Sequence, residues 1–143
     1  MRSHLELESN TFRENTGKSI SSKTASIIDS HSKYEQNWGD SGSCITIMIE
    51  STYKGTDITF DYNEAVYNGG AVHVTSESVF TCDSCIFTNN KANSGGAIYA
   101  ESDGQATITA STFYGNIASG NGSALFFTSS IKSTVSSVSS STF

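Results

Sequence analysis

The chain of 143 residues contains no proline, one tryptophan and three cysteines, and only 15% of its residues are charged. No apolar run approaches the roughly 18 residues that cross a bilayer, which excludes a transmembrane helix. The eight basic residues are scattered and the net charge is -6. Because phosphate binding needs clustered Lys and Arg, we exclude a nucleic-acid partner. The N-terminus also lacks the apolar core of a signal peptide.

The residues that are abundant, Ser, Thr, Gly and Asn, can signal disorder, but here the apolar residues recur in register. An aromatic residue returns at intervals of 22, 26, 27, 26 and 30 residues, at Phe12, Tyr34, Phe60, Phe87, Phe113 and Phe143. An asparagine follows three residues after the first five, at Asn15, Asn37, Asn63, Asn90 and Asn116. A fixed period of this length predicts stacked, equivalent units, none of which buries its apolar face alone.

A glycine-rich element recurs with the same period. It reads Gly69-Gly70-Ala71-Val72 in one copy and Gly95-Gly96-Ala97-Ile98 in the next. Ser43 and Ser123 replace the second glycine in the flanking copies. We expect the paired glycines to supply backbone angles with positive φ and a close approach at a sharp corner.

Short alternating runs, such as Val72-His-Val74 and Ile98-Tyr-Ala100, predict one strand in each period, with a second strand before the aromatic. No window shows a convincing amphipathic helix. The sequence therefore predicts an all-β protein, a single-stranded right-handed parallel β-helix of about five to six coils of 22–30 residues. The stacked aromatic rings would fill its axis, and the asparagines would form a ladder at a turn.

We interpret residues 1–143 as one β-helix segment of a longer chain. Residues 34–127 carry the strong repeats, whereas 1–33 and 128–143 read as degenerate or terminal coils. Phe143 falls in mid-repeat and neither end offers a cap for the strand edges.

The combination of Phe-x-x-Asn with Gly-Gly-Ala-Ile resembles the repeat of the chlamydial polymorphic outer membrane proteins. The matching positions, which we expect to be mainly structural, are Phe60, Asn63, Gly69, Gly70, Phe87, Asn90, Gly95, Gly96, Phe113 and Asn116. The resemblance implies an extracellular or cell-surface β-helix, similar to an autotransporter passenger, with a role in adhesion.

The cysteines offer three interpretations. Cys82-Asp-Ser-Cys85 has the CxxC spacing, but a zinc site needs four ligands and Cys44 lies more than a coil away. Cys82 shares the inward column of Ile108. We expect structural thiols, and the alternatives are a disulfide and a metal site.

An enzyme is the main alternative, since many β-helices cleave polysaccharides with two carboxyl groups about 5 to 9.5 Å apart. The outward strand positions offer only Glu101, without a partner. Asp57, Asp61 and Glu64 read as a solvated acidic corner. We therefore predict no catalytic residue, metal or cofactor here, and an enzyme would need catalytic coils outside this segment.

The outward column His73, Tyr99 and Phe126 is the candidate binding face. Rings that stack on neighbouring coils could form a platform for a sugar or a protein. The competing interpretation is packing between strands or coverage by another segment. Nothing identifiable in the sequence orients His73 as a base. We predict a non-catalytic adhesive or structural rod, whose partners would be proteins or glycans of a host or neighbouring cell; a spacer without a ligand is a further alternative.

Overall fold

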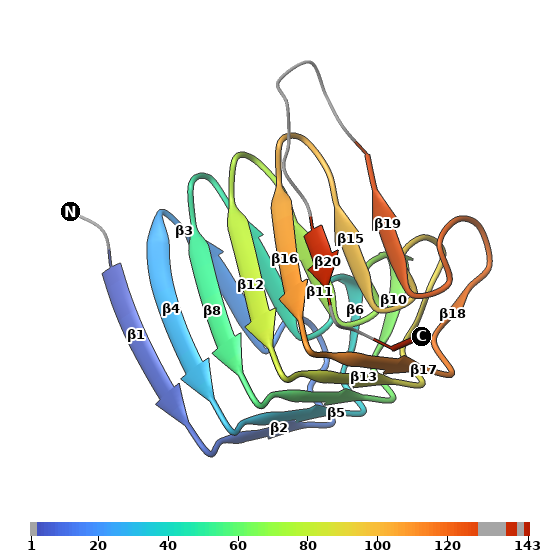
Figure 1. Ribbon diagram of the computed structural model, residues 1–143, viewed down its shortest axis with the longest axis horizontal. Coiled ribbons are helices and arrows are strands. Elements are labelled where there is room, and N and C mark those ends of the chain that lie inside the picture. The colour runs from blue at the N-terminus through green and yellow to red at the C-terminus, as the bar shows by residue number, and fades with distance from the viewer. Residues whose placement is uncertain (1–2, 129–136, 140–141) are drawn as a thin grey trace.

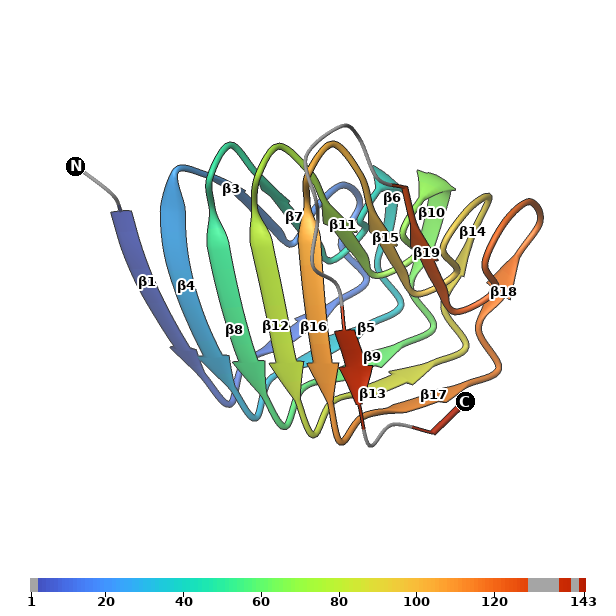
Figure 2. The same cartoon turned by 45° about the horizontal axis from the view of Figure 1, so that its top comes forward.

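The computed structural model describes residues 3–128, 137–139 and 142–143, and all its regular elements are strands. They form four parallel sheets that enclose one core (Figures 1 and 2). Sheet A contains, along the axis, β1 (Ser3–Glu8), β4 (Ala25–Ser30), β8 (Thr52–Thr56), β12 (Val79–Asp83), β16 (Gln105–Thr109) and β20 (Ser137–Ser139). Sheet B contains β2 (Thr11–Arg13), β5 (Lys33–Glu35), β9 (Thr59–Asp61), β13 (Ile86–Thr88) and β17 (Thr112–Tyr114).

The other two sheets complete each coil. Sheet C contains β6 (Trp38–Ser41), β10 (Glu64–Asn68), β14 (Lys91–Ala92) and β18 (Ile117–Ala118). Sheet D contains β3 (Ile20–Lys23), β7 (Ile45–Met48), β11 (Val72–Val74), β15 (Ile98–Ala100) and β19 (Leu125–Phe127). From β4 onward the chain thus passes through sheets A, B, C and D in turn and then begins the next coil, whereas the first coil has no strand in sheet C. This arrangement confirms the predicted parallel β-helix.

The register between coils follows the sequence repeat. Phe87 pairs with Phe60 on one side and with Phe113 on the other. The rings of this column are stacked, with centroids 4.7 to 5.0 Å apart from Phe12 to Phe143. Burial of such rings is the largest apolar contribution that this small core offers.

Each coil has more strands than the sequence predicted. The aromatic and the residues around Asn63 lie in short strands of sheets B and C, which are too brief to show an alternating pattern. Single residues with positive φ separate these strands: Ser84 lies between sheets A and B, and Tyr62 lies between sheets B and C. The strand β7 ends at Met48, and Ile49 turns outward with a φ of 55°.

The two glycines of each corner have different roles. Gly69 has a φ of +61°, as does Gly95, whereas Gly70 and Gly96 do not have positive φ. A Cβ on Gly70 would instead lie 2.0 Å from the carbonyl oxygen of Gly96 in the next coil. The expectation of positive φ is therefore right for the first glycine of each pair and wrong for the second. The second position requires glycine because the backbones of two coils touch there and leave no room for a Cβ.

Cys82 and Cys85 form a disulfide, so the expectation of structural thiols is wrong for this pair. Ser84, with a φ of 57°, folds the chain sharply between them, and their Cα atoms are 6.0 Å apart. Both residues are fully buried. Cα atoms at this distance whose side chains share one interior are within disulfide reach. Cys44 is free and buried.

The structure describes more of the N-terminal region than of the C-terminal region. Residues 3–30 form a regular coil, since β1 pairs with β4 over six residues. At the other end β20 pairs with β16, and Phe143 continues the ring stack. The remainder of the predicted terminal coil, residues 129–136 and 140–141, lies outside the described residues.

Candidate functional site

The predicted binding column lies on the outer side of sheet D. His73 pairs with Tyr99, and Tyr99 pairs with Phe126. The ring centroids are 5.5 Å apart for the first pair and 5.6 Å for the second. The sequence therefore placed these three rings in one column correctly.

Their predicted exposure is wrong for two of the three. Tyr99 is only 8% exposed, and the side chain of His73 is 13% exposed. The glycine corners that precede each strand lie against this side of the sheet. A Cβ on Gly95 would come within 3.1 Å of the Cα of Tyr99. A side chain that points outward from the strand is therefore covered by its own coil.

Polar contacts also bind this column together. Nε2 of His73 lies 2.9 Å from Oε1 of Glu101, and the hydroxyl of Tyr99 donates to Oε2 of Glu101 at 3.3 Å. The expectation that nothing orients His73 is therefore wrong. The partners of Glu101 are an imidazole and a hydroxyl, not the second carboxylate that glycoside hydrolysis uses. Burial lowers the pKa of His73, although the bond to Glu101 acts in the opposite direction. The arrangement holds a neutral imidazole against a carboxylate.

The acidic residues near the sheet B corner each contact a partner in a neighbouring coil. Nζ of Lys91 lies 2.8 Å from Oε1 of Glu64. Oδ1 of Asp61 accepts a hydrogen bond from the hydroxyl of Thr88 at 2.6 Å. Asp57 lies 3.5 Å from the ring of His31. These carboxylates therefore link coils to one another.

The asparagine column is a directional ladder of hydrogen bonds. The side-chain oxygen of Asn90 accepts from both the backbone N–H and the side-chain amide of Asn63, at 3.1 and 2.9 Å. The amide of Asn90 donates to the carbonyl of Phe60 in the preceding coil at 3.0 Å. Asn63 and Asn90 are fully buried. The column satisfies backbone groups at the corner between sheets B and C, and its role is structural.

Sequence reasoning missed a buried polar cluster around Asp29. Oδ2 of Asp29 accepts hydrogen bonds from the hydroxyls of Tyr34 and Tyr53, at 2.6 and 2.8 Å. Within the described residues, Oδ1 of Asp29 is buried without a hydrogen-bond partner. Burial raises the pKa of both tyrosines well above 10. The sequence did contain a signal for this cluster. Asp29 is in register with Gly55, in a column of sheet A whose other described members face the core.

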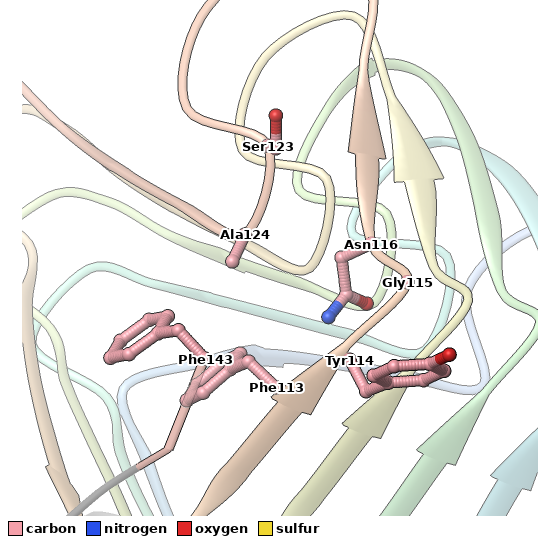
Figure 3. Close-up of a pocket in the computed structure, with 7 residues that line it drawn as sticks. All are labelled: Phe113, Tyr114, Gly115, Asn116, Ser123, Ala124 and Phe143. Atoms are coloured by element: carbon pink, nitrogen blue, oxygen red, sulfur yellow. The ribbon is translucent and has the colours of Figure 1, made fainter.

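A hollow of about 320 Å³ lies at the C-terminal end of the core (Figure 3). Phe113 and Phe143 form one side of it, and Asn116 and Ala124 face them. All four belong to the repeating core columns. The hollow is therefore the open end of the solenoid interior rather than a separate ligand cavity.

The outer side of sheet C carries exposed apolar residues that the sequence analysis did not single out. Trp38 is 47% exposed, Val66 43%, Tyr67 59% and Ile117 58%. One signal was available in the sequence, since five residues separate Asn63 from Gly69 where four separate Asn90 from Gly95. The extra residue forms a bulge in β10.

Comparison with known families identifies the repeat. Residues 57–75 and 84–101 match the Chlamydia polymorphic membrane protein (Chlamydia_PMP) repeat. No curated protein and no solved structure is significantly similar to the chain. Within the described residues, no helix has both the length and the apolar character needed to cross a membrane. Both matched stretches run across the Phe, Asn and Gly columns of the β-helix, and the chain therefore carries repeats of the Chlamydia polymorphic membrane protein type.

Proposed function

We propose that this chain is a non-catalytic module exposed outside the cell or on its surface, where it serves as an adhesive or structural rod. Its partners would be proteins or glycans on a host or neighbouring cell. The observation that carries the proposal is the match of two successive coils to the polymorphic membrane protein repeat. Coils about 4.8 Å apart repeat the same outward positions along a stiff axis, which suits many weak contacts.

The disulfide supports a location outside the cytosol. Cys82 and Cys85 are bonded to each other within the core of the fourth coil. Disulfides persist in oxidising compartments such as the periplasm and the extracellular space, and are rare in the cytosol. A rod that is assembled or displayed there gains stability from such a bond.

The column of His73, Tyr99 and Phe126 contributes mainly to cohesion between coils in this proposal. Tyr99 and the side chain of His73 have little exposed area, and Glu101 already takes up their polar atoms. Phe126, which is half-buried, is the member that a partner can reach. A triple alanine variant at the three positions separates cohesion from binding.

The test measures adhesion directly. Beads coated with the purified chain are compared, for attachment to cultured animal cells, with beads that carry a variant lacking residues 61–87. This deletion joins equivalent positions of two coils, because Phe60 and Phe87 are in register. We expect attachment above that of albumin-coated beads and weaker attachment after the deletion, with circular dichroism confirming that both chains retain β structure. Attachment no greater than that of albumin would contradict the adhesive role.

A second candidate, a carbohydrate-active β-helix, draws on the contact between His73 and Glu101. A carboxylate held by an imidazole on an outer strand is a chemically plausible acid or base. The candidate predicts release of reducing ends from acidic or neutral polysaccharides, and loss of that release in Glu101→Gln.

A further inference from the structure

The outer side of sheet C carries two exposed aromatic and two exposed aliphatic side chains. We call the outward residues Trp38, Asp40, Glu64, Val66, Tyr67 and Ile117 the sheet C face. Trp38 pairs directly with Glu64, and Lys91 pairs with both Glu64 and Ile117, which places these side chains in one column. Tryptophan and tyrosine are the residue types that contribute most to protein interfaces, and they are costly to leave in water without such a use.

A β-bulge displays two of these residues at once. The register of β10 against β6 shifts between Ala65 and Asn68. In a regular strand, successive side chains point to opposite sides, whereas Val66 and Tyr67 are both exposed. The bulge lies opposite Asp40, because Gly39 pairs with Ala65 and Ser41 with Asn68. Bulges often re-aim a side chain at a functional surface.

Carboxylates accompany these rings. Asp40 lies two residues after Trp38 in β6, and both are exposed on the same side of the strand. Glu64 pairs with Trp38 of the preceding coil, and its Oε1 lies 2.8 Å from Nζ of Lys91. Glu35 ends β5, the strand that precedes Trp38 in its coil. The part of the sheet C face around Trp38 and Tyr67 therefore combines the carboxylate of Asp40 with two electron-rich rings, whereas the charge of Glu64 is offset by Lys91.

We propose that the sheet C face binds an extended protein segment that is rich in arginine or lysine. A guanidinium or ammonium group that lies over Trp38 or Tyr67 would gain a cation–π contact, and Asp40 would supply the counter-charge. Val66 and Ile117 would pack against the apolar stems of the same side chains. This inference rests on the proposed adhesive function and names the class of partner for it.

Charge decides between this partner and a glycan. Sulfated and sialylated glycans are anionic, and a chain with a net charge of -6 repels them. A neutral sugar can stack on the aromatic rings but brings no cation to Asp40. A second copy of the chain would bring the same carboxylates into contact with one another. A basic protein segment satisfies both the charge and the apolar features.

The test uses fluorescence anisotropy with a labelled peptide of six Gly-Arg units, and the full chain as titrant. We expect binding that weakens as salt rises, because the attraction is partly electrostatic. The variant Trp38→Ala/Tyr67→Ala should weaken it by roughly tenfold, as for hot-spot aromatics. A peptide of six Gly-Glu units should not bind.

Matched charge variants separate a site from the overall charge of the chain. Asp40→Asn/Glu64→Gln removes two negative charges of the sheet C face, and Glu6→Gln/Glu8→Gln removes two on the distant β1. We expect the first pair to weaken peptide binding several-fold more than the second, with equal urea midpoints for both. Equal weakening by the two pairs, or no loss in the aromatic variant, would overturn the proposal, because binding would then reflect net charge alone.

Bead attachment to cells distinguishes this inference from the function on which it rests. Failure of the unmodified chain to bind the peptide, together with cell attachment that survives in Trp38→Ala/Tyr67→Ala, would overturn the sheet C site while the adhesive role stands. Direct binding of a neutral oligosaccharide to the chain that is lost in Trp38→Ala/Tyr67→Ala would also overturn the choice of partner. Peptide binding and cell attachment that are lost together in the aromatic variant would support both.

Discussion

The outer sides of sheets C and D belong to the same coils, and each carries aromatic residues, but those of sheet C are the more accessible. In sheet D, Tyr99 is 8% exposed and is tied to Glu101, whereas in sheet C, Tyr67 is 59% exposed. The difference arises from the turns between them. The glycine corner lies over the start of each sheet D strand, while the bulge in β10 lifts side chains away from sheet C. Pointing outward from a strand is therefore not the same as facing solvent.

The largest effect is expected from breaking the corner that covers sheet D. Gly69 has a φ of +61°, and the Cβ that Gly69→Ala adds would lie 2.0 Å from the carbonyl oxygen of Val72. Because the contact is with backbone, we expect a loss of about 3 kcal/mol or more in the free energy of unfolding. Urea denaturation followed by circular dichroism measures it. A loss below about 1 kcal/mol would mean that the corner moves freely and does not hold sheet D.

A pair of identical substitutions tests the two faces directly. Tyr99→Ala removes a buried ring and its bond to Glu101, and should cost about 2 to 4 kcal/mol. Tyr67→Ala removes an exposed ring and should change stability by less than about 0.5 kcal/mol. Urea midpoints of the two variants give the comparison. Similar midpoints would show that the faces do not differ in coverage.

The smallest expected effect is a dependence of stability on pH that arises from His73 in sheet D. Burial lowers the pKa of His73 in the folded chain, against an unfolded value near 6.5. Folding therefore favours the neutral ring, and its contribution is fully present above pH 6.5 and is lost as pH falls through the folded pKa. His73→Gln should flatten the fall in the urea midpoint between about pH 7 and pH 5. An unchanged slope in this variant would contradict the assignment.

The sequence was sufficient for features that every coil repeats. Phe87 and Asn90 have the same surroundings in each coil, so their spacing predicted both the β-helix and the register. It was insufficient for features that depend on the path of a single turn. The disulfide required the sharp turn at Ser84, and the coverage of Tyr99 required the position of a glycine corner against the strand.

The sheet C face also depends on the path of a single segment, which the sequence alone did not determine. The one-residue difference between the Asn63–Gly69 and Asn90–Gly95 intervals was visible in the sequence, but the sequence did not indicate whether it would form a loop or a bulge. The pairing of Ser41 with Asn68 decides this, since the strand resumes after the extra residue. Val66 and Tyr67 are exposed as a consequence.

Hydroxyl-radical footprinting with mass spectrometry tests the contrast between the two faces most directly, because it reports the accessibility of single side chains in the folded chain. The structure predicts rapid oxidation of Trp38 and Tyr67 and strong protection of Tyr99. After denaturation in urea, the two tyrosines should react at similar rates, which controls for intrinsic reactivity. Equal oxidation of Tyr67 and Tyr99 in the folded chain would contradict the account, because sheet D would then be as accessible as sheet C.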